Sequence, residues 1–125
     1  MARIYNVLVI EEDPDMFDIH KFNLEELECE AVQAPLDLVE IGKYIEECDF
    51  ILSDIVPMLD AEGNPAYDVI ADIAARCNKD IILCTARYQE DLKNKKFTYY
   101  VAKPIPRGDL KAAVEACKNR ISSRY

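Results

Sequence analysis

The sequence lacks several features that would assign it to a large class of proteins. No apolar run is long enough to cross a bilayer, and no charged segment followed by an apolar one opens the chain as a secretory signal would. Positive charge is scarce, since the formal net charge is −9 at pH 7. Nucleic acids and anionic membranes attract proteins with a positive field, so neither is expected as a main partner. We expect a cytoplasmic protein whose only local basic patch is at Lys93, Lys95 and Lys96.

The number and spacing of the cysteines and the scarcity of glycine also exclude some kinds of site. The five cysteines are an odd number and form no Cys-x-x-Cys pair. Neither a zinc site nor a disulfide framework is therefore expected, and most of them are predicted to be small buried side chains in a reducing cytosol. With only three glycines, the chain has no Gly-rich phosphate-binding loop. This argues against a flavin carrier.

The residues that are present fit one domain spanning 1–125. The chain is 50% hydrophobic and 31% charged, enough for a sizeable core and a soluble surface. Short apolar runs alternate with stretches of helical spacing. Continuous apolar runs are typical of strands covered on both faces. The predicted strands are Val7–Ile10, a weak one near Ala31-Val32, Phe50–Ser53, Ile81–Cys84 and Tyr99–Ala102.

The helical stretches complete an α/β pattern. Pro14 behind Asp13 is a typical helix start, because Asp caps well and Pro is tolerated in the first turn. The other predicted helices lie after Leu38, after Pro65, over residues 88–95 and from Leu110 to Ile121. Five strands alternating with helices predict a doubly wound parallel sheet with helices on both faces.

Polar residues follow four of these strands. An acid where a buried strand emerges is costly unless something charged or reactive meets it, and Asp54 is such an acid. In a parallel sheet, sites lie beyond the carboxyl ends of the strands. That edge would gather three acids, a hydroxyl and an ammonium, which suits a divalent cation and a phosphoryl group. These residues are Glu11, Glu12, Asp54, Thr85 and Lys103.

Four short motifs in this order resemble the response-regulator receiver domain of two-component signalling. They are Val7–Pro14, Ser53-Asp54-Ile55, Thr85-Ala86-Arg87 and Lys103-Pro104-Ile105. Each motif ends an apolar run, and the resemblance covers nearly the whole chain. It implies a flavodoxin-like sheet with strand order 2-1-3-4-5.

The resemblance also implies roles for the strand-end residues. Asp54 would be the phosphoacceptor, taking a phosphoryl group from a phosphohistidine of a partner histidine kinase or phosphotransfer protein. Lys103 would neutralise phosphate oxygens, and Thr85 would hydrogen-bond one of them. Mg²⁺ would be the cofactor, because it takes carboxylate and phosphate oxygens and keeps waters. Its protein ligands would be Glu11, Glu12, Asp54 and the backbone carbonyl of Val56.

Further residues would control access and output. Ala86 is small and leaves Asp54 open, while Val56 and Arg87 would flank the path of the hydrolytic water. Tyr100 would turn inward when Thr85 is drawn to the phosphorylated site. This switch would present a surface to a downstream protein that the sequence does not identify.

The chain departs from the family pattern in three respects. Both acids of the first motif are glutamates, and one extra methylene displaces a carboxylate by up to about 1.5 Å. Pro57 comes one residue early, before a lengthened loop that runs through Asn64. The stretch between Thr85 and Lys103 is short by about one helical turn of roughly four residues. We therefore predict a shortened fourth helix and an unusual partner interface.

Two other functions stay open. A degenerate pseudo-receiver would serve as a phosphorylation-independent protein-binding module, which the two glutamates favour and Asp54, Thr85 and Lys103 oppose. A small-molecule hydrolase or phosphotransferase with an aspartyl nucleophile would need a second acid where Val56 stands, and a cap domain. His20, the only histidine, is predicted to be a packed or surface residue away from the strand ends and not a phosphodonor.

Overall fold

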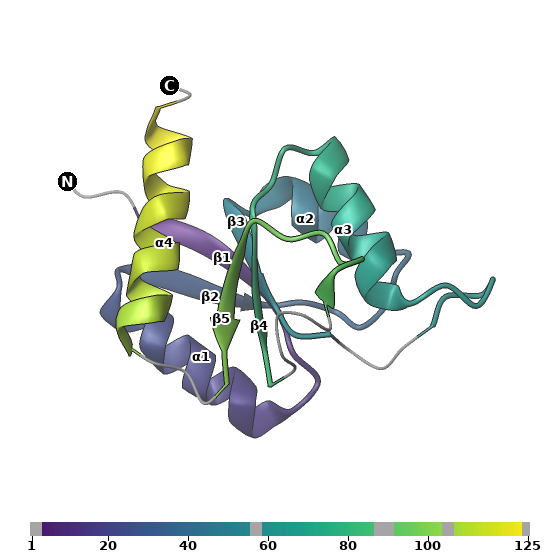
Figure 1. Ribbon diagram of the computed structural model, residues 1–125, viewed down its shortest axis with the longest axis horizontal. Coiled ribbons are helices and arrows are strands. Elements are labelled where there is room, and N and C mark those ends of the chain that lie inside the picture. Colours follow the sequence, from purple (N-terminus) through teal and green to yellow (C-terminus); the bar gives the residue numbers. More distant parts are fainter. Residues whose placement is uncertain (1–3, 56–58, 87–91, 104–106, 124–125) are drawn as a thin grey trace.

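The computed structural model describes residues 4–55, 59–86, 92–103 and 107–123 of the chain. Strands and helices alternate along most of it, as the apolar runs and helical spacing predict (Figure 1). The elements are β1 (Tyr5–Ile10), α1 (Pro14–Glu26), β2 (Cys29–Gln33), α2 (Ile41–Glu47), β3 (Phe50–Ser53), α3 (Ala66–Arg76), β4 (Ile81–Thr85), β5 (Tyr99–Ala102) and α4 (Arg107–Ser122).

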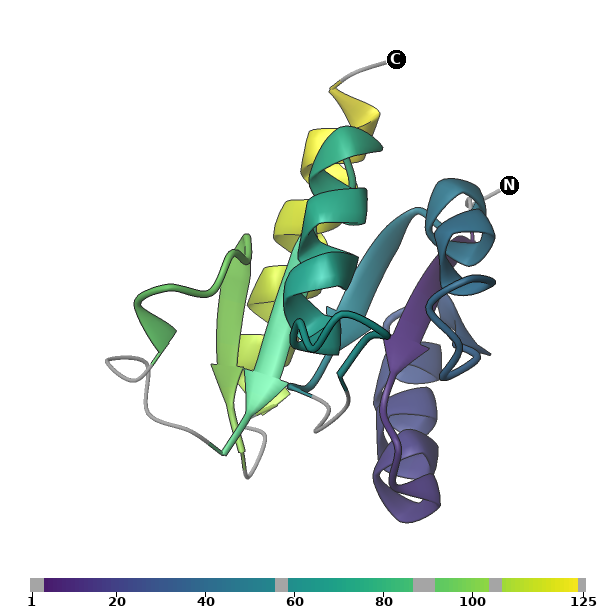
Figure 2. The ribbon, with the colours of Figure 1, turned by 90° about the vertical axis from the view of Figure 1, so that its right-hand side faces the viewer.

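The five strands form one parallel sheet in the order β2-β1-β3-β4-β5. This confirms the predicted doubly wound sheet with order 2-1-3-4-5. The arrows of β1, β4 and β5 point the same way in Figure 2, so their carboxyl ends lie at one edge of the sheet. Among the described residues no helix is long and apolar enough to cross a membrane.

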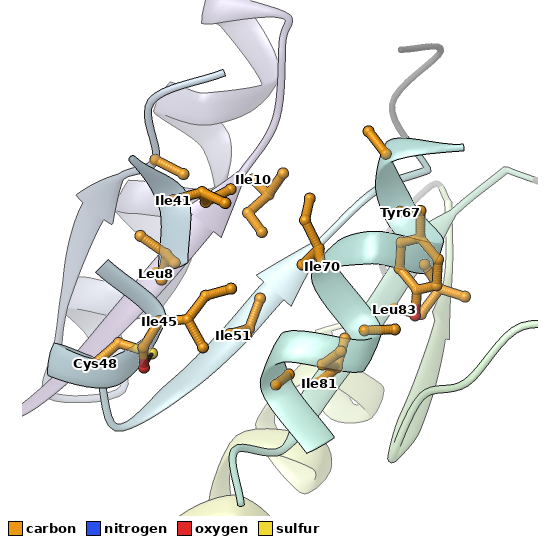
Figure 3. Packing of buried hydrophobic residues seen from close by; sticks show 14 of the residues in the cluster. Leu8, Ile10, Ile41, Ile45, Cys48, Ile51, Tyr67, Ile70, Ile81 and Leu83 are labelled. Carbon is orange, nitrogen blue, oxygen red and sulfur yellow. Dashed lines mark hydrogen bonds between the residues drawn. The ribbon is translucent and has the colours of Figure 1, made fainter. Parts of the chain in front are cut away.

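Alternation along the strands divides the core into two halves. In β1, Leu8 and Ile10 pack against α2 and α3, whereas Val7 and Val9 pack against α1 and α4. Figure 3 shows the first half, where Ile45 of α2 and Ile70 of α3 cover the sheet beside Leu8 and Ile10. The helices therefore cover both faces, α1 with α4 on one side and α2 with α3 on the other (Figure 1).

The first helix begins as its sequence predicts. The Asp13 side chain accepts a hydrogen bond from the backbone N–H of Asp15 at 2.9 Å, and Pro14 occupies the first helical turn. The cap satisfies an N–H group that has no partner inside the helix. As a result, α1 starts four residues after β1 and returns along the sheet with its buried side facing β1.

The segment before β5 is attached to α3 by three contacts. The Tyr67 hydroxyl donates to the Lys96 carbonyl at 2.5 Å, Lys95 Nζ donates to Asp68 Oδ1 at 2.9 Å, and Lys96 Nζ donates to Asp72 Oδ1 at 3.3 Å. Half of the predicted short helix over 88–95, residues 88–91, lies outside the described ranges. Its described part, 92–95, forms a turn in which the Lys95 N–H donates to the Leu92 carbonyl.

All five cysteines are free, and four of them are buried. Burial raises the pKa of Cys48, Cys84 and Cys117 to about 12 in each case, and raises that of Cys29. These thiols stay protonated at neutral pH, and since the thiolate is the reactive form they are inert. The expectation of small buried thiols holds for all except Cys77, which is half-buried.

Thiol labelling of the native protein should therefore modify mainly Cys77. We expect a disulfide reagent near pH 7.5 to release one equivalent of chromophore quickly, and the remaining thiols to react only after denaturation. The Cys77→Ser variant should lose the fast phase. Two or more fast equivalents in the wild type would contradict the buried positions of the other four.

Candidate functional site at the carboxyl edge of the sheet

Asp54 stands immediately beyond β3, at the centre of the sheet edge. Its backbone N–H donates to the carbonyl of Ile10 at 3.1 Å, which extends the β1–β3 ladder by one residue. Its carboxylate accepts from the backbone N–H of Ile55 through Oδ1 at 2.7 Å and from Lys103 Nζ through Oδ2 at 2.8 Å. The side chain is 24% exposed. A reactive oxygen is thus fixed in position and still reachable from solvent.

Lys103 joins Asp54 to a second acid. Its backbone N–H donates to the carbonyl of Thr85 at 3.1 Å, which holds the residue after β5 against β4. Its ammonium donates to Asp54 Oδ2 at 2.8 Å and to Glu11 Oε1 at 3.0 Å. Burial by itself favours the neutral amine, but the hydrogen bonds to Asp54 and Glu11 outweigh it and raise the pKa of Lys103 above its usual range. Lys103 is therefore a fixed positive charge at neutral pH.

Glu11 and Glu12 lie in very different surroundings. The Glu11 side chain is 4% exposed, contacts Lys103, and accepts weakly from the Asp13 N–H at 3.4 Å. Glu12 is exposed, and none of the described contacts joins it to Asp54 or Lys103. Of the two predicted acids, only Glu11 is brought together with Asp54.

His20 belongs to the same cluster, and the prediction that it lies away from the strand ends was wrong. It is 2% exposed on the inner side of α1, with Nε2 3.7 Å from Glu11 Oε1. Burial, assisted by the charge of Lys103, lowers the pKa of His20, so it is neutral near pH 7. Its spacing from Phe17 and Leu24, three and four residues, is the signal that could have shown it to face inward.

Thr85 and Tyr100 lie on the other face of the same edge. Thr85 ends β4, is buried, and pairs with Ala102 in the sheet register, while Ala86 after it is exposed. Tyr100 is half-buried against the α2–α3 half of the core, its ring 6.3 Å from that of Phe97. Val56 and Arg87 lie outside the described residues.

The donor atoms suit a magnesium ion in part. Magnesium in proteins is commonly bound by one or two carboxylates together with waters and phosphate oxygens. Glu11 Oε1 and Asp54 Oδ2 already converge on a cation, since both lie within 3.0 Å of Lys103 Nζ. The described residues include no group of three or more His, Cys, Asp or Glu side chains arranged for a metal. Two carboxylates are therefore the protein ligands that this part of the chain offers.

The fold defines a class. The chain has the fold of response-regulator receiver domains, as its four motifs predict. It is similar to the signal receiver domain of a modulated diguanylate cyclase from Desulfovibrio desulfuricans G20, with 21% identity, 98% of this chain and 100% of that chain covered, and a TM-score of 0.76. It is equally similar to a response regulator receiver domain protein from Clostridium thermocellum, with 22% identity, 98% and 100% covered, and a TM-score of 0.75.

A third solved structure has the same fold. The receiver domain of a sensor histidine kinase from Pseudomonas aeruginosa PAO1 is 22% identical, with 91% of this chain and 97% of that chain covered and a TM-score of 0.69. That structure holds a magnesium ion coordinated in its active-site cleft. No family model matches the sequence. No curated protein matches it either.

Proposed function

We propose that this protein is a response-regulator receiver that is phosphorylated on Asp54 and switches a protein-interaction surface. The observation that carries the proposal is the pairing of a partly exposed Asp54 carboxylate with the Lys103 ammonium at 2.8 Å, at the carboxyl edge of a receiver-type sheet. The donor would be a histidine kinase or phosphotransfer protein in the cytoplasm. The chain would be a signalling module whose only catalysis is its own phosphoryl transfer and dephosphorylation.

The proposed reaction transfers a phosphoryl group from a phosphohistidine to the Asp54 carboxylate. One carboxylate oxygen attacks the phosphorus of a phosphohistidine, an O–P bond forms as the N–P bond breaks, and the leaving imidazole takes up a proton. Positioning and charge stabilisation supply most of the rate in phosphoryl transfer. Lys103 already lies beside the nucleophile and stays charged, so it can stabilise the negative charge that the phosphoryl group brings.

Glu11 and Asp54 would hold the magnesium ion. Of the further ligands that the family resemblance implies, Glu12 is exposed and joined to neither of these acids, and the Val56 carbonyl lies outside the described residues. The ion would reduce the repulsion between these acids and an incoming phosphate. Lys103 now bridges the two carboxylates, so it would have to give up its bond to Glu11 for both to turn toward another cation. His20 would keep Glu11 on the inner side of α1 during that change.

The proposed switch would involve Thr85 and Tyr100, which lie at the same edge of the sheet but on its other face. A phosphoryl group on Asp54 would draw the Thr85 hydroxyl, and Tyr100 on the neighbouring strand shares the face and core half of that residue. Thr85 lies opposite Ala102, two residues along β5 from Tyr100, and a close-packed interior would transmit a shift of Thr85 to that ring. The surface around β5 would then change shape for a downstream protein.

Phosphorylation by a small acyl-phosphate donor tests the proposal. Wild-type protein incubated with magnesium and acetyl phosphate should gain the mass of one phosphoryl group, and Asp54→Asn should gain none. Asp68→Asn, which alters another partly exposed Asp that pairs with a lysine, is the matched control and should label like the wild type. The proposal fails if the wild type stays unlabelled or if Asp54→Asn labels equally.

One set of contacts favours a second candidate, a pseudo-receiver that binds a partner without phosphorylation. Lys103 satisfies both Glu11 and Asp54, and the exposed Glu12 adds nothing to the cluster. Each of the two carboxylates thus already has a cationic partner within the protein. An unlabelled wild type that keeps its fold would favour this alternative.

A further inference from the structure

An apolar groove lies between the loops that follow β2 and β3. It has a volume of about 510 Å³, and six of the nine residues that line it are apolar. Three of these residues are unusually exposed for their type: Val39 is 92% exposed, Leu59 66% and Leu36 43%. Single exposed apolar side chains are common, but a group of them around a hollow is typical of an interaction site.

Both walls of the groove have a fixed backbone. In the first wall, Asp37 Oδ1 accepts from the Val39 N–H at 2.8 Å, and the Asp37 carbonyl accepts from Ile41 at the start of α2. In the second, Asp60 accepts from the backbone N–H groups of Glu62 and Asn64 at 2.9 and 2.7 Å. Leu59 and Pro65 close this loop by an antiparallel bridge. The described part of the lengthened loop, residues 59–65, therefore has a fixed backbone, and it projects beyond α3 in teal (Figure 1).

The charged residues around the groove all have one sign. Asp37, Asp60 and Glu62 line it together with the apolar side chains, and none of the described lining residues is a lysine or arginine. Hydrogen bonds from Asn64 lower the pKa of Asp60, so this carboxylate is charged at any physiological pH. The groove thus offers apolar area inside an acidic rim.

A second copy of this chain is a poor occupant. Its net charge is −9, so two copies repel. Two of the three lysines in its local basic patch are also engaged, because Lys95 and Lys96 pair with Asp68 and Asp72 of α3. Charge complementarity therefore favours a different protein with a basic surface.

We propose that this groove docks a basic amphipathic segment of a partner protein, with apolar side chains between Val39 and Leu59 and Lys or Arg residues against the acidic rim. An amphipathic helix laid into a preformed apolar groove is a recurrent mode of recognition. The docking surface lies at the same sheet edge as Asp54, since its second wall follows β3. It goes beyond the proposed function and needs no phosphoryl group, so Asp54→Asn should bind the segment as the wild type does.

A designed peptide tests the groove. The probe is a fluorescein-labelled amphipathic helix of leucine and lysine, about 15 residues long so that it holds helical structure. Fluorescence anisotropy should report binding to the wild type that weakens with salt. Val39→Ser and Leu59→Ser should each raise the Kd roughly tenfold, as expected for removing one buried apolar side chain. Glu62→Gln should raise it less and flatten the salt dependence.

Two controls separate the groove from non-specific attraction. Ile19→Ser removes an apolar side chain that is 48% exposed on α1 and should leave the Kd unchanged. A leucine–glutamate peptide of the same pattern should not bind. The proposal is overturned if Ile19→Ser weakens binding as much as Val39→Ser, if the probe does not bind, or if sedimentation shows a wild-type dimer that Val39→Ser dissociates.

Discussion

Replacing Lys103 with methionine is expected to destabilise the fold by about 3 kcal/mol, the typical cost of leaving a buried charge without its partner. The reason is Glu11, whose side chain is 4% exposed and whose Oε1 lies 3.0 Å from the Lys103 ammonium. Methionine nearly matches the length of lysine but supplies no charge and no donor. Urea unfolding at pH 7.5, followed by circular dichroism, measures the difference in the free energy of unfolding.

The chain offers a matched control in Lys95. Its ammonium lies 2.9 Å from Asp68, and its side chain is 20% exposed, close to the 16% of Lys103. Asp68, however, is 45% exposed, so water can replace the lost partner. Lys95→Met should therefore cost less than about 1 kcal/mol.

A double variant identifies the source of the loss. Lys103→Met combined with Glu11→Gln removes both charges and should recover most of the stability, because contacting residues are coupled in a double-mutant cycle. If Lys103→Met costs no more than Lys95→Met, or if Glu11→Gln fails to restore stability, the buried ion pair does not hold this edge together.

The two glutamates that follow β1 should differ sharply in phosphorylation. Glu11→Gln is expected to slow the labelling of Asp54 by acetyl phosphate and magnesium roughly tenfold, about 1.4 kcal/mol in the barrier. Glu11 is the acid that converges with Asp54 on a cation, whereas Glu12 is exposed and joined to neither. Glu12→Gln should change the rate less than twofold, roughly 0.4 kcal/mol.

Metal binding gives this comparison a second readout. Water proton relaxation with Mn²⁺ as the probe should show weaker binding for Glu11→Gln and near-wild-type binding for Glu12→Gln. Because both substitutions are isosteric, unfolding midpoints serve as the control for intact folds. Equal effects of the two variants on labelling and on Mn²⁺ binding would contradict the unequal roles of these acids.

Much of the architecture could be predicted because four of the five strands of the sheet contain a continuous apolar run, β2 with Glu30 and Gln33 being the exception. Phe50–Ser53, for example, is predicted as a buried strand, and the structure has a strand there that is buried at every position. The start of α1 was also predictable, since Asp13 and Pro14 act within one turn. The connection between β4 and β5 was harder, because the contacts of Lys95 and Lys96 with α3 join residues far apart in the chain.

The sequence predicted which residues at the strand ends form the site. The alternation of side chains along each strand also shows which face of the sheet each of these residues occupies. Side chains alternate between faces along a strand. Glu11 continues the face of Val7 and Val9, and Lys103 continues that of Val101, all on the side of α1 and α4. Glu12 has the opposite parity, which agrees with its separation from the cluster. Glu11 could thus have been distinguished from Glu12 by counting along β1.

The contact of His20 with Glu11 could not be predicted in this way. Its spacing from Phe17 and Leu24 predicts that His20 faces inward, but it does not predict which side chain at the sheet edge His20 meets once the helix is packed. Packing of Leu24 into the core under α1 sets the rotation of the helix, and His20 is then buried against Glu11.

The three contacts between α3 and the segment before β5 have a mechanical consequence. Tyr67, Asp68 and Asp72 bond to residues 95 and 96 from one helix, so α3 is joined directly to the start of β5. Lys103 directly follows the other end of β5. Any displacement of its ammonium by a new ligand at Asp54 would be transmitted backward along the strand to α3, on the face of the molecule opposite to α1 and α4.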